Sequence, residues 1–341
     1  MYVMPAEWEP QDAVWLSWPH NKEDWPGKFE PIPWVFAEIV RHLTRTVRVR
    51  LLVKNAAAKK QAIDYCKRGG ADLKRIDFYD VPTDRGWMRD CGPIFVRDGK
   101  KKNLLDWRFN GWAKYDNHTH DDKVPALLNR QLRLPAIRPM HKGKRVVLEG
   151  GAIDVNGNGT LLTTEECLLS KVQQRNPGFS RDDYEAVFEK YLGARHVIWL
   201  GKGIAGDDTH GHVDDLARFV SPTTVVTVVE KNKRDDNYAL LQDNLRRLKK
   251  ARDQNGKPLT VAELPMPRPL FFEGQRLPAS YANFLISNKR VLVPTFNDPN
   301  DRLALNILAE LMPKHEIVGI HCVDLVWGLG TLHCMSQQEP V

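Results

Sequence analysis

Four short segments of this 341-residue chain place acidic, histidine or cysteine side chains beside glycine or tryptophan. They read GWMRDCGP, VLEGGAID, GDDTHGHVDDLARF and WGLGTLHCMSQQEP, and their key members are Asp90, Glu149, His212 and Cys334. Most cysteines in proteins are buried and inert. A thiol becomes a nucleophile when a histidine and a carboxylate lie beside it, because such neighbours activate the thiolate. If the four segments meet in space, the sequence predicts nucleophilic catalysis by Cys334.

The spacing of these four residues indicates that they do meet. Successive gaps of 59, 63 and 122 residues separate them along the chain. After a first helix, helical periodicity begins near residues 56, 122, 181, 237 and 302, so a structural unit recurs about every sixty residues. Equivalent positions of units arranged in a ring face a common axis. The gaps of about one, one and two units would therefore bring the four side chains together.

The expected elements recur in the order strand, strand, helix, strand. Helices are expected at 34–44, 56–67, 122–131, 181–191, 237–250 and 302–311. Strands are expected at 13–18, 47–53, 73–79, 103–107, 146–148, 159–163, 197–200, 216–220, 224–229, 281–286, 291–294 and 316–320. Hairpin turns are expected at 98–99, 156–159 and 288–289. We expect one domain, 1–341, of about five α/β units, and two unrelated α/β domains are the alternative.

Composition indicates a globular protein. Hydrophobic residues make up 42% of the chain and charged residues 27%, which excludes general disorder. The five cysteines form no C-x-x-C pair, which argues against a disulfide framework. No apolar stretch approaches the roughly 18 residues that a membrane span needs. The acidic start of the chain is unlike a secretion signal, so we expect a cytoplasmic protein with no membrane partner.

The net charge of +7 raises the question of nucleic-acid binding. The basic residues are spread along the chain, and the one compact run, Lys100–Lys102, has the composition of a solvated hairpin tip. Nucleic-acid-binding proteins instead cluster their basic residues on one face or in a known motif. We therefore expect no nucleic-acid partner.

A metal site is the rival interpretation of the histidine segment. Strand alternation would place four potential ligands on one face: Asp208, His210, His212 and Asp214. The helical H-E-x-x-H spacing is absent, and the nearest cysteines lie far away in sequence. The pairs at 321–322 and 333–334 would not converge on zinc, because adjacent residues of a strand point to opposite faces. We expect no metal.

Six stretches of the chain, in this order, resemble motifs of the agmatine deiminase and bacterial peptidylarginine deiminase family of guanidine-modifying enzymes. They read MPAEWEPQDAVWLSWP, WMRDCGP, LEGG, TLLTTEECLL, GHVDDLARFV and LHCMSQQEP, and they extend over essentially the whole chain. The resemblance implies a five-bladed, pseudo-fivefold α/β propeller of ββαβ modules, known as a pentein. It also implies hydrolysis of agmatine to N-carbamoylputrescine and ammonia, and a homodimer. The alternatives are an arginine or peptidylarginine deiminase that produces citrulline, and a non-catalytic propeller that binds guanidines.

The resemblance also implies roles for particular residues. Cys334 would be the nucleophile and His212 the general acid and base. Asp90 and Asp214 would bind the guanidinium, and Glu149 would support them as a further carboxylate. Three more residues are expected at the substrate: Trp87, which would lie against it, Asp208 and Asn283.

Guanidinium chemistry explains why these residue types are needed. The group is planar and cationic, and carboxylates bind its N–H edges through charge-assisted hydrogen bonds. The thiolate would attack the central carbon, and His212 would protonate the departing ammonia and then activate a water. Because positioning and charge matching supply the rate, we expect no cofactor. Two positions depart from the family's usual motifs: Asp215, where agmatine deiminases often have asparagine, and Leu329, where a glycine is usual.

Overall fold

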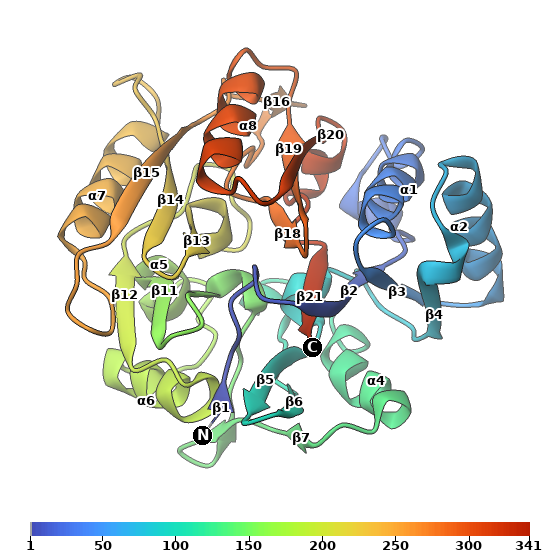
Figure 1. The fold of residues 1–341 in the computed structure, drawn as a ribbon, viewed down its shortest axis with the longest axis horizontal. Helices are drawn as coiled ribbons and strands as arrows, with labels where there is room; N and C mark the ends of the chain where they lie inside the picture. The colour runs from blue at the N-terminus through green and yellow to red at the C-terminus, as the bar shows by residue number, and fades with distance from the viewer. Residues whose placement is uncertain (1) are drawn as a thin grey trace.

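The computed structural model describes residues 2–341 as a mixed α/β fold, with small sheets toward the middle and helices at the periphery (Figure 1). The longer helices are α1 (Ile32–Leu43), α2 (Ala56–Arg68), α4 (Val124–Leu132), α6 (Arg181–Leu192), α7 (Asn237–Lys250) and α8 (Asn300–Leu311). All of the helices predicted from periodicity are confirmed, with ends that agree to within two residues. Of two short helices, α3 (Met88–Cys91) lies within a predicted site segment, and α5 (Glu165–Leu169) carries Cys167, whose sulfur lies near Glu149 and His212.

Local sequence explains where helices begin and end. Helix α2 follows Asn55, whose side chain accepts a 2.9 Å hydrogen bond from the Ala58 N–H. Helix α6 begins with a reciprocal capping box between Ser180 and Asp183. It ends at Gly193, whose φ of 70° is the left-handed conformation that glycine adopts at little cost.

Three sheets of residues 2–341 repeat one arrangement, in which an antiparallel hairpin is followed by a helix and then by a strand that pairs in parallel. Their strands are β10 (Asp154–Val155), β11 (Thr160–Thr164) and β12 (His196–Leu200); β13 (Ala217–Ser221), β14 (Thr224–Val229) and β15 (Thr260–Pro265); and β18 (Leu285–Ser287), β19 (Arg290–Thr295) and β20 (Glu316–His321). A parallel pair requires such a crossover, which a helix provides. The predicted order of strand, strand, helix, strand is confirmed in these sheets.

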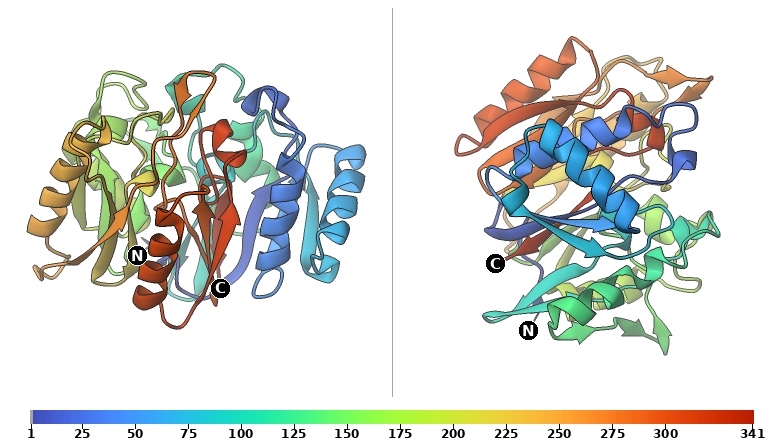
Figure 2. Two further views of the ribbon diagram at one scale, coloured as in Figure 1. Left: turned by 90° about the horizontal axis from the view of Figure 1, so that it is seen from above. Right: turned by 90° about the vertical axis from the view of Figure 1, so that its right-hand side faces the viewer.

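Two further sheets of the same residues have four strands and involve the chain ends. One has the order β1 (Tyr2–Val3), β5 (Ile94–Asp98), β6 (Lys101–Leu105), β7 (Ala136–Ile137), and the other β21 (Ser336–Pro340), β2 (Gln11–Ser17), β3 (Arg48–Val53), β4 (Ile76–Asp80). The C-terminal strand β21 runs antiparallel to β2. The two termini lie on the same side of the molecule (Figure 2). The segment that carries Cys334 is therefore anchored to the N-terminal part of the chain.

Two two-stranded sheets complete the described strands. They are the hairpins β8 (Met140–His141) with β9 (Lys144–Arg145), and β16 (Phe271–Phe272) with β17 (Gln275–Arg276). No helix in residues 2–341 combines the length and the apolar character that crossing a membrane requires.

All three predicted hairpin turns are confirmed, whereas some predicted strands are wrong. The expected strand at 146–148 is only an isolated bridge between Arg108 and Val147. The expected strand at 281–286 begins at Leu285, because the residues before it turn around a hydrogen bond from the Ser280 hydroxyl to the Asp215 carbonyl. Strands β5, β15 and β21 were not among the predicted ranges.

Candidate active site

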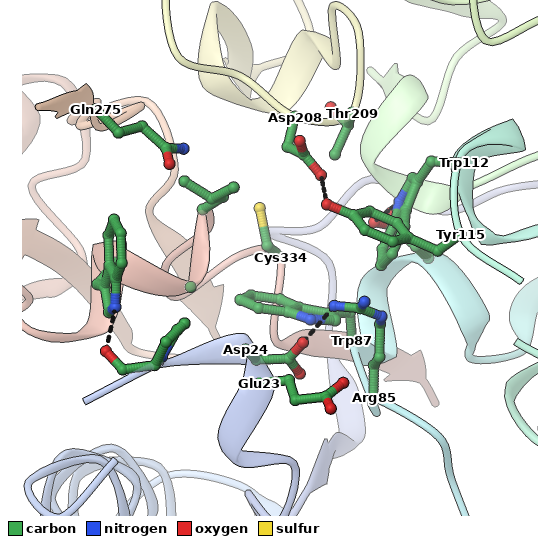
Figure 3. A pocket seen from close by; sticks show the side chains of 15 residues that line it. Glu23, Asp24, Arg85, Trp87, Trp112, Tyr115, Asp208, Thr209, Gln275 and Cys334 are labelled. Atoms are coloured by element: carbon green, nitrogen blue, oxygen red, sulfur yellow. Dashed lines mark hydrogen bonds and ion pairs between the residues drawn. The ribbon is translucent and has the colours of Figure 1, made fainter. Parts of the chain in front are cut away.

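A pocket of about 130 Å³ contains four of the predicted site side chains, Cys334, Asp90, Trp87 and Asp208, in its wall. The sulfur of Cys334 points into the pocket, and the indole of Trp87 lies beneath it (Figure 3). Trp87 is 7% exposed and packs against Trp25 with ring centroids 5.7 Å apart. The indole therefore offers a fixed aromatic surface beside the thiol.

Cys334 lies between the short helix η7 (Leu325–Gly328) and strand β21. Its Sγ is 3.0 Å from Asn283 Nδ2 and 3.7 Å from Asp214 Oδ2. Burial raises the pKa of this thiol well above its usual value, and the charges of Asp214, Asp215 and Asp90 raise it further. At neutral pH the thiol therefore keeps its proton until a positive charge arrives beside it.

His212 precedes the short helix η6 (Val213–Asp215) and is completely buried. Its ring reaches two carboxylates, with Nδ1 3.8 Å from Asp90 Oδ1 and Nε2 3.8 Å from Glu149 Oε2. Burial lowers the pKa of the imidazole, but the charge of Asp90 and the proximity of Cys167 and Glu149 outweigh it and raise the pKa well above its usual value. His212 is therefore an imidazolium that can donate a proton.

Asp90, in α3, has both carboxylate oxygens oriented by neighbours. Trp112 Nε1 donates to Oδ2 at 2.9 Å, and the Gly151 N–H donates to Oδ1 at 3.1 Å. Burial raises the pKa of Asp90 to about 6, although the charge of His212 opposes it. A cation in the pocket would favour the ionised form.

Glu149 is held by a buried ion pair. Arg175 Nε lies 3.0 Å from Glu149 Oε1, and both side chains are 0% exposed. Burial alone would raise the pKa of Glu149, but the charge of Arg175 and the nearby imidazole of His212 lower it to about 2. The second oxygen, Oε2, faces the His212 ring and has no hydrogen-bond partner. Glu149 is thus a fixed negative charge behind the imidazolium.

Asp214 belongs to a second buried chain of charges. His333 Nδ1 lies 2.7 Å from Asp214 Oδ2, and His333 Nε2 lies 2.9 Å from Glu7 Oε2. Arg218 in turn pairs with Glu7 and with Asp154. Although burial raises the pKa of Asp214, hydrogen bonding to His333 and the positive charge of His333 lower it overall. Asp214 therefore stays ionised beside the thiol.

The expectation that residues 208–214 alternate along a strand is wrong. The segment is a turn followed by η6, and Gly206 and Gly211 adopt φ values of 89° and 95°, which bend the chain. The Asp207 side chain accepts hydrogen bonds from the N–H groups of Gly211 and His212, which holds the bend. His210 bonds Ser170 at 3.1 Å and borders a different cavity.

The two remaining predicted site residues occupy different places. Asp208 lines the pocket, where its carboxylate is already paired with Lys114 and accepts a 2.7 Å hydrogen bond from Tyr115 (Figure 3). Asn283 contacts the Cys334 sulfur but is not among the residues that line the pocket.

Sequence reasoning missed several residues that shape this site. His333 was considered only as a possible zinc ligand, and Glu7 only as part of an acidic start, although together they orient Asp214. Trp112, which bonds Asp90, and Asp24, which lines the pocket, lie in segments without an unusual pattern. The position of His333 next to Cys334 was the one available signal.

Two buried groups within residues 2–341 bring potential metal ligands to within 4.8 Å of one another: Glu149, Cys167 and His212, and Asp214, Asp215 and Cys334. Glu149 and Asp214 already face Arg175 and His333, so these carboxylates fit an ion-pair network. That the protein works without a metal remains a prediction.

Comparison with known proteins places this site among relatives of described activity. The family model described as Porphyromonas-type peptidyl-arginine deiminase matches residues 3–340. Agmatine deiminases of Stutzerimonas stutzeri and Pseudomonas aeruginosa are each 35% identical to this chain, over 99% of it and 95% of their own length.

Solved structures agree with this placement. The agmatine deiminase of Enterococcus faecalis is 34% identical with a TM-score of 0.89, covering 99% of this chain and 96% of that one. A C. jejuni agmatine deiminase with substrate bound is 30% identical, with the same TM-score and the same coverage. An amidinotransferase from Microseira wollei, 11% identical over 98% of this chain and 95% of its own with a TM-score of 0.53, shares the fold alone.

Proposed function

The chain belongs to the Porphyromonas-type peptidyl-arginine deiminase family, and we propose that it is an agmatine deiminase that produces N-carbamoylputrescine and ammonia. The observation that carries the proposal is the placement of Cys334 and Asp90 in one pocket, with Asp214 3.7 Å from the sulfur and His212 3.8 Å from Asp90. The relatives named agmatine deiminase support the choice of substrate.

Binding is the first step of the proposed mechanism. Asp90 lines the pocket, and Asp214 lies 3.7 Å from the sulfur with its Oδ1 free of hydrogen bonds within residues 2–341, so each carboxylate can accept N–H bonds from a planar guanidinium bound at the thiol. Trp87 adds a cation–π contact worth roughly 0.5–2 kcal/mol. The same carboxylates oppose ionisation of Cys334 while the site lacks a cation. The bound guanidinium offsets their charge and lowers the pKa of the thiol, so substrate binding itself promotes the thiolate.

Covalent chemistry follows in two stages. As the guanidinium binds, the Cys334 thiol loses its proton to solvent. The thiolate attacks the central guanidinium carbon, and the His212 imidazolium gives its proton to the departing nitrogen, which leaves as ammonia. The neutral His212 then takes one proton from a water that attacks the amidino carbon. The C–S bond breaks, and the sulfur takes up the remaining hydroxyl proton as the ureido product forms. Glu149, fixed by Arg175, stabilises the imidazolium that this step restores.

The opposite wall of the pocket favours a substrate with a cationic tail. Asp24 lines this wall, and its Oδ2 is buried with no hydrogen-bond partner. The nearby cation, Arg85, already has two partners. Its Nη1 lies 2.5 Å from Asp24 Oδ1, and its guanidinium stacks 4.1 Å from the Tyr115 ring centroid. Glu23 adds another carboxylate. The ammonium of agmatine fits this wall, whereas the carboxylate of free arginine would be repelled.

The fold proposal accompanies the functional one. The three-stranded and four-stranded sheets would be five modules of a pseudo-fivefold propeller in one domain, 1–341. The repeated hairpin, helix and parallel strand support this arrangement, and so does the pairing of β21 with β2. The protein would also be a homodimer and cytoplasmic. Light scattering, which measures the molar mass in solution, would test the homodimer.

Turnover assays separate the candidate activities. The purified protein is incubated with agmatine, free arginine or a blocked arginyl peptide, and ammonia and ureido product are measured. We expect product from agmatine in excess of the other two, unchanged by a chelator. Faster turnover of arginine or of the peptide than of agmatine would show that the protein is instead an arginine or peptidylarginine deiminase. Absence of turnover with all three would contradict the enzyme, and activity lost to chelator and restored by metal would contradict a metal-free mechanism.

A further inference from the structure

Glu149, Cys167 and His212 form a buried group of three side chains, which are 0%, 1% and 0% exposed. One potential metal-ligand atom of each lies within 4.8 Å of the other two, and His212 Nε2 is 3.8 Å from Glu149 Oε2. Two atoms that bind one Zn²⁺ at roughly 2.1 Å in tetrahedral geometry are about 3.4 Å apart. Each side chain therefore needs only a small shift to bind a common ion.

Two of these side chains carry buried polar atoms that lack partners. Glu149 Oε2 and both ring nitrogens of His212 have no hydrogen-bond partner within residues 2–341. Arg175 Nε holds only the other carboxylate oxygen, Oε1, at 3.0 Å. Buried polar atoms are usually paired, because an unpaired one costs free energy. An ion in the centre of the group would give a partner to the carboxylate oxygen and to one ring nitrogen.

The first turn of α5 holds Cys167 beside His212. Thr164 Oγ1 accepts a 3.1 Å hydrogen bond from the Cys167 N–H. The same hydroxyl donates a 2.5 Å hydrogen bond to the carbonyl of Gly211, the residue directly before His212. The second ring nitrogen, Nδ1, is 3.8 Å from Asp90 Oδ1, and a carboxylate beside that nitrogen commonly accepts the remaining N–H of a metal-bound histidine. The ligands and their supporting groups are therefore in place before an ion binds.

Exchange of two protons for one Zn²⁺ leaves the net charge of this group unchanged. The charges of an imidazolium, a thiol and a carboxylate sum to zero, and so do those of Zn²⁺, a neutral imidazole, a thiolate and a carboxylate. Metal ligands must be deprotonated, so binding releases one proton from the His212 ring and one from the Cys167 sulfur. The ion therefore binds without burying an additional charge, which would be costly in this environment.

We propose that Glu149, Cys167 and His212 form an inhibitory Zn²⁺ site. Thiolate and imidazole ligands favour Zn²⁺ over Mg²⁺ and Ca²⁺, which bind oxygen ligands. The ion occupies His212 Nε2, so the ring can neither donate a proton to the departing nitrogen nor accept one from water. Inhibition rests on the proposed role of His212 as general acid and base, whereas binding of the ion does not.

Zinc binding is measured first in a chain that cannot use the nucleophile as a ligand. Cys334→Ala removes one member of the second ligand group, Asp214, Asp215 and Cys334. This variant is incubated with Zn²⁺ until binding is complete and is titrated against a chromophoric chelator. We expect one ion per chain. Adding Cys167→Ser should weaken binding about 100-fold or more, because serine does not supply a thiolate.

Two further measurements separate ligation from folding. Cys66, in α2, is also buried and belongs to neither ligand group, so Cys66→Ser added to Cys334→Ala is the matched control and should leave binding unchanged. Calorimetry in buffers of different ionisation enthalpy should count about two protons released per ion near pH 7. Co²⁺ bound to Cys334→Ala should show a thiolate charge-transfer absorption that Cys167→Ser removes. Circular dichroism reports the folded fraction of each variant.

Inhibition is then measured with wild type and agmatine. Zn²⁺ should abolish turnover after incubation, and a chelator should restore it. Cys167→Ser should need about 100-fold more Zn²⁺ for the same fractional inhibition, since its affinity for the ion is lower by that factor. Each protein is compared with its own activity in the presence of the chelator, so any effect of the substitution on turnover cancels.

Each outcome bears on a different claim. Zinc binding by Cys334→Ala that Cys167→Ser does not weaken would overturn the site, and so would binding by wild type that Cys334→Ala abolishes. Equal inhibition of wild type and Cys167→Ser would overturn the inhibitory role. If wild type does not turn over agmatine but Cys334→Ala binds Zn²⁺ through Cys167, the proposed function fails while the metal site stands.

Discussion

Cys334 depends on its neighbours for reactivity. The carboxylates of Asp214 and Asp90 that would bind a guanidinium also raise the pKa of the thiol, so the nucleophile is suppressed until a cation arrives. Asp90 and Glu149 also raise the pKa of His212, which therefore holds its proton. The Cys334 thiol and the His212 imidazole therefore both carry a proton in the free protein. In the proposed mechanism the thiol loses its proton only when the substrate is bound.

Protonation of Asp90 predicts how activity depends on pH. Its pKa in the free protein is about 6, so the carboxylate that binds the guanidinium is neutralised as pH falls through that value. With methylguanidine, which has no cationic tail, kcat/KM should fall on the acid side of about pH 6. With agmatine a further decline should begin near pH 7, because burial raises the pKa of Asp24 to about 7.

Asp24→Asn separates these two contributions to the pH profile. The variant should remove the decline near pH 7 with agmatine and leave the methylguanidine profile unchanged. Profiles of kcat/KM that coincide for the two substrates in wild type would contradict a role for Asp24 at the substrate tail.

The pair of Arg175 and Glu149 predicts a stability effect. Arg175→Met leaves the Glu149 carboxylate buried without its partner, which costs about 3–5 kcal/mol of unfolding free energy. The exposed pair of Arg68 and Asp64 is the control, and Arg68→Met should cost less than about 1 kcal/mol. Urea unfolding measures both, and equal effects would contradict the structural role of the buried pair.

Residue types and spacing were sufficient to predict that Asp90, Glu149, His212 and Cys334 come from segments that meet in space. Their partners were not predictable, because a contact such as that between His333 and Glu7 joins residues 326 positions apart. Asn283 was expected at the substrate from its place in the repeat, and only coordinates could show that its amide faces the thiol.

At the scale of elements, turns position the groups that we propose to be catalytic. Asp90 is in the single turn of α3, His212 precedes η6, and Cys334 precedes β21. The longer helices were predicted from the period of their apolar residues, and about half of the strands in residues 2–341 were predicted from runs of β-branched and other apolar residues. Strand β21 was missed because its sequence SQQEP is polar, yet all five residues are buried. Two of its side chains bond distant partners: Gln338 accepts a 2.6 Å hydrogen bond from Arg89, and Glu339 accepts one from Trp15.

The close approach of Gly151 to the site predicts the effect of one added methyl group. A Cβ at this position would lie 2.4 Å from His212 Nδ1 and 2.9 Å from Asp90 Oδ1, so Gly151→Ala must displace the ring. We expect kcat to fall about 100-fold, since misplacement by about 1 Å costs this much.

Gly143→Ala is the control for this substitution. Its Cβ meets nothing within 4 Å, although its φ of 75° adds strain. This variant should lose some stability and keep its kcat. A Gly151→Ala variant with wild-type kcat would contradict this prediction, because the added methyl group would then not displace the His212 ring.

At the scale of the whole molecule, the chain ends hold the site together. Strand β21 pairs with β2, and the Trp15 indole donates a 2.9 Å hydrogen bond to Glu339. Because the N-terminal and C-terminal segments share a sheet, we expect all 341 residues to unfold as one unit. Tryptophan fluorescence and far-ultraviolet circular dichroism should give coincident urea transitions. Separated transitions would favour two α/β domains.

Trapping the covalent intermediate tests the central claim most directly. Wild type and Cys334→Ala are mixed with agmatine, quenched in acid within the first turnovers, digested and analysed by mass spectrometry. We predict that the wild-type Cys334 peptide gains the mass of agmatine minus one ammonia, as expected for an amidino group bonded to sulfur. We predict that Cys334→Ala forms neither adduct nor product. Product formation by Cys334→Ala, or an adduct on another residue, would contradict the account.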